Sequence, residues 1–124
     1  MDVEKHVVYW RTTAAEELEV AGELLEKKRT RQVLYFCQLA LEKYLKALVC
    51  RAMSDIPPRI HNLVRLGELA GLKLALTEWD FLNEMTGYNI EGRYPETLGD
   101  EPSFDVAMKY HHETVRFCEW LNQK

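Results

Sequence analysis

Arg31 to Met53 read RQVLYFCQLALEKYLKALVCRAM, and this stretch decides the fold. At about 100° per residue, its apolar side chains fill roughly half of the circumference of a helix. A surface helix needs a narrower stripe, so the pattern predicts a central helix that packs against two or more neighbours. The apolar set comprises Val33, Leu34, Phe36, Cys37, Ala40, Leu41, Tyr44, Leu45, Ala47 and Leu48.

The other half of this helix carries polar side chains in an ordered pattern. Gln38, Glu42 and Lys46 stand one turn apart in a single row, and Tyr35 and Lys43 share that half. Such a row is a good place to build a binding site. A central bundle helix without a ligand has the same pattern, and a surface pair of Glu42 and Lys46 stabilises a helix by only a few tenths of a kcal/mol.

Length and composition are those of one soluble globular domain spanning residues 1–124, with 47% apolar and 29% charged residues. The net charge of −4 argues against a protein that binds nucleic acid through a general excess of positive charge. No apolar run approaches the ~20 residues of a membrane span, and the first residues do not resemble a secretory signal. Cys37, Cys50 and Cys118 are expected in or near the core, which favours a reducing cytoplasm.

The segments on both sides of the central helix have clear boundaries. A first helix is expected from about Glu4 to Lys28, and Thr30 is expected to cap the central helix. Ser54 to Pro58 ends the central helix, because two successive prolines cannot continue it. The first helix has one apolar stripe with spacings of three or four residues: Trp10, Ala14, Leu18, Ala21 and Leu25.

Three further helices are expected in the second half of the chain. His61 to Ala70 forms a short one that stops at Gly71, and Thr77 caps another that runs to about Tyr88. Ser103 opens the last helix. No strand-like alternation occurs, so the fold class is all-α: an up-and-down four-helix bundle with an additional short helix.

Asn89 to Pro102, NIEGRYPETLGDEP, is the longest segment without helical periodicity. It is longer than the usual connection between bundle helices, and long loops in compact domains are often functional. Arg93 and Tyr94 lie in its middle, directly before a proline. We therefore include both residues among the candidates for a binding site.

Common catalytic and cofactor motifs are absent from the sequence. There is no C-x₂-C or H-E-x-x-H pattern, and the adjacent His111 and His112 point about 100° apart on a helix. There is no glycine-rich phosphate loop either. No metal, cofactor or catalytic residue is expected. What remains is a distributed polar set: Glu42, Lys43, Lys46, His61, Arg93 and Tyr94.

Several motifs in this order resemble the HEPN domain, named for higher eukaryotes and prokaryotes nucleotide-binding. They are ALEKYLKAL (Ala40 to Leu48), PPRIHNLVRL (Pro57 to Leu66) and RYP (Arg93 to Pro95), ahead of a final helix. The opening YWRTTAAEELEVAGELL (Tyr9 to Leu25) resembles the first helix of that family. The resemblance covers nearly the whole chain.

The resemblance implies a helical bundle that forms homodimers and presents a groove to a nucleotide or to RNA. It also implies a partnership with a separate minimal nucleotidyltransferase, as its substrate-binding or regulatory subunit in a toxin–antitoxin-like pair. Many relatives are metal-independent endoribonucleases with an Arg followed, after four to six residues, by a His. No arginine here has a histidine at that distance: His61 follows Arg51 by ten residues and Arg59 by two.

Three functions follow from these observations. The first is a nucleotide-binding module in which Lys46 and Arg93 hold phosphate and Glu42 orients Lys46 or accepts from a ribose hydroxyl. In this hypothesis Tyr94 or Tyr35 stacks a base, and His61 adds a donor. The second is a structural dimer or adaptor without a ligand. The third, disfavoured by the missing motif, is an endoribonuclease in which His61 and Arg93 meet in space.

Overall fold

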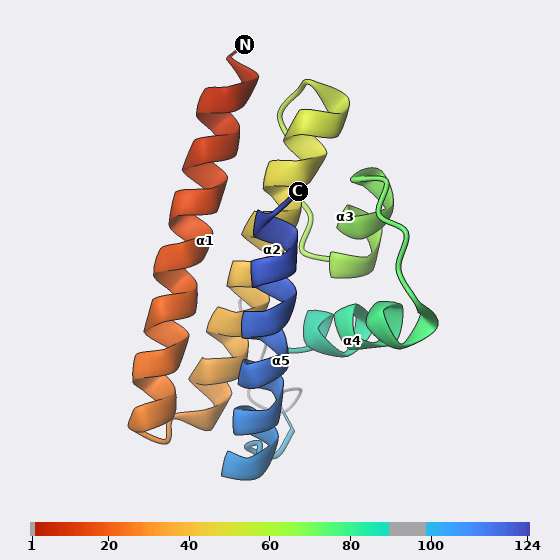
Figure 1. Cartoon of the computed structure of the whole chain (residues 1–124). Coiled ribbons are helices and arrows are strands. Elements are labelled where there is room, and N and C mark those ends of the chain that lie inside the picture. Colours follow the sequence, from red (N-terminus) through yellow and green to blue (C-terminus); the bar gives the residue numbers. More distant parts are fainter. Residues whose placement is uncertain (1, 90–98) are drawn as a thin grey trace.

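The computed structural model describes residues 2–89 and 99–124, and over these residues all regular secondary structure is α-helical. α1 (Val3–Glu26) and α2 (Thr30–Met53) form an antiparallel pair joined by the short connection 27–29 (Figure 1). This arrangement places the start of α1 beside the end of α2. The carboxylate of Asp2 caps α1 by accepting a hydrogen bond from the backbone N–H of Lys5 at 3.1 Å.

The third long helix, α5 (Phe104–Asn122), packs against both α1 and α2. Its start agrees with the sequence prediction, because Ser103 Oγ accepts a hydrogen bond from the backbone N–H of Val106 at 3.2 Å. Small residues of α1 let α2 approach closely, and α2 supplies most of the core. Each fully buried leucine contributes about 1.5–3 kcal/mol relative to an exposed one. Core residues of the three helices include Ala14, Ala21, Leu34, Leu41, Leu45, Phe117 and Leu121.

Two short helices complete the fold. α3 (Leu63–Leu69) packs on α2, and α4 (Leu76–Thr86) packs on α3 and runs across the direction of the long helices (Figure 1). Gly67 permits the contact between α3 and α4, because a Cβ atom at this position would lie 2.9 Å from Cζ3 of Trp79. Thr86 Oγ1 accepts a hydrogen bond from the backbone N–H of Leu63, which ties the end of α4 to the start of α3.

Two predicted helix caps are wrong. Thr30 is the first residue of α2 and not its cap: its hydroxyl donates to Glu101 Oε1 at 3.2 Å, and Arg29 is the N-cap. α4 begins at Leu76, before the predicted cap Thr77, and its N-cap is Ala75. Ala75 has no side-chain acceptor, but Glu78 Oε1 accepts from its backbone N–H at 2.9 Å, which supports the earlier start.

The predicted fold class is confirmed: the chain is a helical bundle with an additional short helix. All three cysteines are buried, as expected, and burial raises the pKa of the Cys37 thiol to about 12. None of the helices among the described residues is both long and apolar enough to cross a membrane.

Candidate functional site

The polar row on α2 is buried. The exposed fractions of Gln38, Glu42 and Lys46 are 0%, 3% and 7%. Their spacing of four residues along the helix is nevertheless typical of a stripe that faces solvent. The connection after α2 accounts for this burial, because it returns along the helix: the backbone carbonyl of His61 accepts from Gln38 Nε2 at 3.3 Å. The interpretation of Glu42 and Lys46 as a surface pair is therefore wrong.

Glu42 is the centre of a buried hydrogen-bond network. Its Oε2 accepts from Lys46 Nζ at 3.0 Å, and its Oε1 accepts from Gln38 Nε2 at 3.1 Å. Nδ1 of His61 lies 2.8 Å from the same Oε1. Since a carboxylate only accepts hydrogen bonds, Nδ1 of this imidazole carries the proton. The carboxylate is thus satisfied by three donors, as a buried charge requires.

Lys46 extends from this network to a cavity of about 730 Å³. Its Nζ lies 5.5 Å from the centre of the Trp10 ring, within the range of a cation–π interaction. Only one of its three ammonium protons is used by Glu42. The start of α1, the end of α2 and the connection before α3 form the walls. The lining residues are Asp2, Lys5, His6, Tyr9, Trp10, Lys46, Ile56, Pro57, Pro58 and Arg59.

The cavity combines positive charge with flat apolar surfaces. Lys5, Lys46 and Arg59 contribute cations, His6 contributes an imidazole, and Asp2 is the one carboxylate among the lining residues. The rings of Tyr9 and Trp10 lie 5.2 Å apart, edge to face. Ile56, Pro57 and Pro58 line the same cavity. Such a site suits an anion that carries a planar ring, because cations hold the negative group while aromatic faces stack on the ring.

Lys43 lies in a different place from Lys46. Its Nζ forms an ion pair with Glu17 Oε1 of α1, and it does not line the cavity. Burial raises the pKa of the Glu17 carboxyl above its ordinary value of 4.5, although Lys43 lowers it by hydrogen bonding and charge. Lys43 thus joins α1 to α2, and this structural role accounts for its charge without a ligand.

The structure brings together three of the six residues that the sequence selected. Lys46 lines the cavity, Glu42 of α2 holds its ammonium group, and His61 of the connection before α3 contacts Glu42. Arg93 and Tyr94 lie outside the described residues. Tyr35, the other candidate for stacking a base, packs edge to face against Phe36, with ring centres 5.6 Å apart, and is not among the lining residues.

The aromatic wall was missed by sequence reasoning. In the sequence, Trp10 belongs to the apolar stripe of the first helix, and Pro57 and Pro58 indicate only the end of a helix. A signal was nevertheless present, because an antiparallel pair with a short connection must place the start of α1 next to the end of α2. That geometry brings Trp10 toward Lys46 and toward the segment that follows α2.

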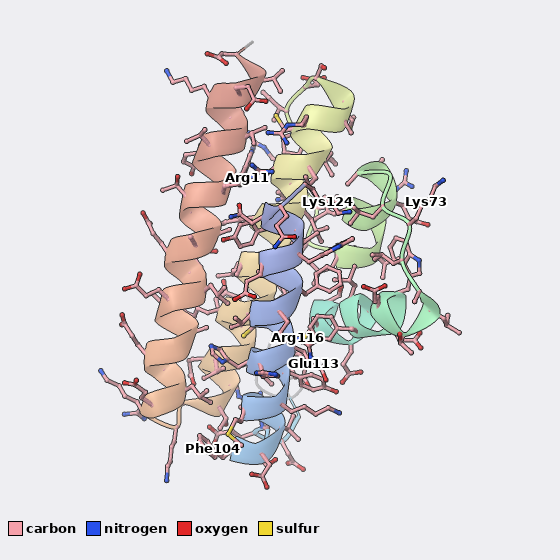
Figure 2. The ribbon with its side chains drawn as sticks, viewed as in Figure 1. Arg11, Lys73, Phe104, Glu113, Arg116 and Lys124 are labelled. Carbon is pink, nitrogen blue, oxygen red and sulfur yellow. The ribbon has the colours of Figure 1, made fainter. Side chains whose placement is uncertain are left out.

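A second hollow, of about 510 Å³, lies between α4 and α5. Phe81, Phe117 and Trp120 line it, and Figure 2 shows Glu113 and Arg116 of α5 on this side of the bundle. Its charged groups, Glu78, Glu113 and Arg116, are of both signs, and none of them is buried as Lys46 is. Among the described residues, no group of His, Cys, Asp and Glu side chains is arranged to hold a metal ion.

The described part of the chain is a bundle of long helices with a basic and aromatic cavity at one end. The family model of the HEPN domain matches residues 7–123, so the chain belongs to the HEPN domain family. The search of curated proteins and the search of solved structures gave no match.

Proposed function

We propose that the protein is a nucleotide-binding HEPN module and that its ligand occupies the cavity beside Lys46. The observation that carries the proposal is a nearly buried ammonium group that faces both an aromatic ring and open space. Base–aromatic stacking contributes about 1–3 kcal/mol per base, and lysine binds phosphate as a point charge. The cavity offers both features within one site.

The expected role of the module is to serve a separate enzyme. Family membership and the resemblance described above support a substrate-binding or regulatory subunit of a minimal nucleotidyltransferase, in a toxin–antitoxin-like pair. In that role the module has no activity of its own. Co-expression with a minimal nucleotidyltransferase tests this role: a stable complex whose nucleotidyl transfer depends on Lys46 is expected, and transfer unaffected by the module would contradict it.

Binding is tested by thermal unfolding with and without nucleoside mono-, di- and triphosphates. A ligand that binds only the folded state stabilises it by about 2.7 kcal/mol at a hundredfold excess over Kd. Lys46→Met in a Glu42→Gln background should reduce this shift, because the double variant removes the ammonium group from the cavity wall and leaves no uncompensated carboxylate in the core. Lys43→Met is the matched control and should keep the shift.

Two results would overturn the proposal. One is the absence of stabilisation by any nucleotide in wild type. The other is an equal loss of the shift in the Lys43→Met control and in the double variant, which would place the ligand elsewhere. Arg93→Ala, tested in the same way, shows whether the segment beyond the described residues contributes to binding.

A structural dimer or adaptor is the second candidate. Tyr9 and Ile56, which line the cavity, are each 59% exposed, and neighbouring Val8 is exposed as well. A second copy of the chain that covered these side chains would bury them through a two-fold contact. Sedimentation equilibrium of wild type and Ile56→Glu tests the dimer: a dimer that dissociates in the variant supports it, and a monomeric wild type excludes it. Cleavage of RNA without added metal tests the disfavoured ribonuclease.

A further inference from the structure

The positive charges of the cavity fall into two groups. Lys46, inside, is compensated by Glu42 at 3.0 Å. Lys5 and Arg59 are exposed, and neither forms an ion pair with another described residue. They come from different walls, Lys5 from α1 and Arg59 from the connection after α2. The exposed charges of the lining are thus two cations and the Asp2 carboxylate, which leaves the mouth of the cavity with a net positive charge.

This division determines the orientation of a ligand. A phosphate placed beside Lys46 would meet a cation that already has a carboxylate partner, and it would add a negative charge next to buried Glu42. A phosphate at the mouth would meet Lys5 and Arg59 and stay in contact with water. The flat ring then enters the cavity, where Trp10 and the proline pair offer apolar surfaces.

We propose that the cavity selects an oxo-substituted base, best a 6-oxopurine such as guanine, with the ring inside beside Lys46 and the phosphate outside between Lys5 and Arg59. The inference rests on the proposed nucleotide-binding function and specifies its ligand. Lys46 is then the residue that determines base specificity. Lys5 and Arg59 hold the phosphate.

The chemistry of Lys46 supports this choice of base. Its ammonium group donates one hydrogen bond to Glu42 and lies 5.5 Å from the centre of the Trp10 ring, and its other two N–H groups have no hydrogen-bond acceptor among the described residues. Guanine presents two adjacent acceptors, N7 and O6, on one edge, and lysine is a common partner of this edge. Adenine replaces O6 by an amino group, which is a donor and would face the ammonium. The same site therefore binds adenine with one unfavourable donor–donor contact.

Glu42, Gln38 and His61 make this selection sharper. The two oxygens of Glu42 are held by Lys46 on one side and by Gln38 and His61 on the other. This arrangement fixes the carboxylate and therefore the direction in which the remaining N–H groups of Lys46 point. A donor that is held in place rejects a mismatched ring edge more strongly than a mobile one.

Isothermal titration calorimetry of the full chain with GMP, IMP, AMP, guanosine and inorganic phosphate tests the proposal. GMP and IMP should bind on the order of tenfold more tightly than AMP, the discrimination expected of one good donor–acceptor contact. Lys46→Met in the Glu42→Gln background should make the affinities for GMP, IMP and AMP equal. Arg59→Ala should lower the affinities for GMP and AMP by the same factor and leave the affinity for guanosine unchanged. Arg65→Ala, an exposed arginine that does not line the cavity, is the control for lost charge.

The outcomes separate this inference from the proposed function. If AMP binds as tightly as GMP and both depend on Lys46, the cavity binds nucleotides but does not select the base, and the inference fails alone. If inorganic phosphate binds and is lost in the Lys46 variant while Arg59→Ala has no effect, the phosphate lies inside and the orientation is wrong. If no nucleotide binds wild type, both proposals fail. Circular dichroism melting of each variant confirms that it is folded.

Discussion

The two glutamate–lysine pairs that involve α2 have the same charged groups but differ in sequence separation and in burial. Glu42 and Lys46 are one turn apart on the same helix and nearly buried, whereas Lys43 reaches across to Glu17 of α1, where the two side chains are 20% and 16% exposed. The first pair belongs to a network that includes His61, and Lys46 of this pair lines a cavity. The second joins two helices. Neighbouring lysines of one helix thus have different roles, determined by what packs over them.

The largest effect is expected from removing the centre of the buried network. Glu42→Ala leaves Lys46 in the core without a carboxylate, and breaking a buried ion pair in this way costs about 3–5 kcal/mol. Urea unfolding of the variant measures the loss. The double variant Glu42→Gln/Lys46→Met is the control and should lose much less, because it leaves no uncompensated charge. An equal loss in both would show that shape, and not charge, makes the network stabilising.

A smaller loss is expected from the pair that joins α1 to α2. Lys43→Met removes the cation that faces Glu17, and the loss of a hydrogen bond to a charged group in a partly exposed position costs about 1–2 kcal/mol. The same urea titration measures it. A loss as large as that of Glu42→Ala would mean that burial does not distinguish the two pairs.

Removing His61 tests the exposed edge of the buried network. His61→Ala deletes the donor at 2.8 Å from Glu42 Oε1, but Gln38 and Lys46 remain, so the expected cost is about 0.5–1.5 kcal/mol. His61→Asn keeps a donor and is the matched control. If the alanine variant is as stable as wild type, water replaces the imidazole at no cost.

The contrast also explains which parts of the molecule the sequence predicts. Helices follow from apolar periodicity, because Leu34, Leu41 and Leu45 repeat on one face whatever covers them. The burial of Lys46 does not follow from apolar periodicity, because it depends on the path of the chain after Pro58. The partner of Lys43 is likewise far away in the sequence, and local spacing carries no information about it. The sequence indicates Glu42 and Lys46 as candidates because they lie four residues apart on one helix.

The smallest effect concerns the pH dependence of the Glu17 pair. Burial raises the pKa of Glu17 in the folded state above 4.5, so the folded protein binds a proton at pH values where the unfolded chain has released it. The stability contributed by this group is complete below pH 4.5 and is lost as the pH rises through the folded pKa. Glu17→Gln removes that dependence.

Relative to wild type, the Glu17→Gln variant should therefore gain stability as the pH is raised from 4.5 to 7, as measured by urea unfolding at several pH values. Glu19→Gln, an exposed carboxylate of the same helix, is the control and should not show this trend. A relative loss that grows with pH would mean that the attraction of Lys43 outweighs the cost of burying the Glu17 carboxylate. The pair between α1 and α2 would then resemble the buried pair of Glu42 and Lys46 more closely than its exposure indicates.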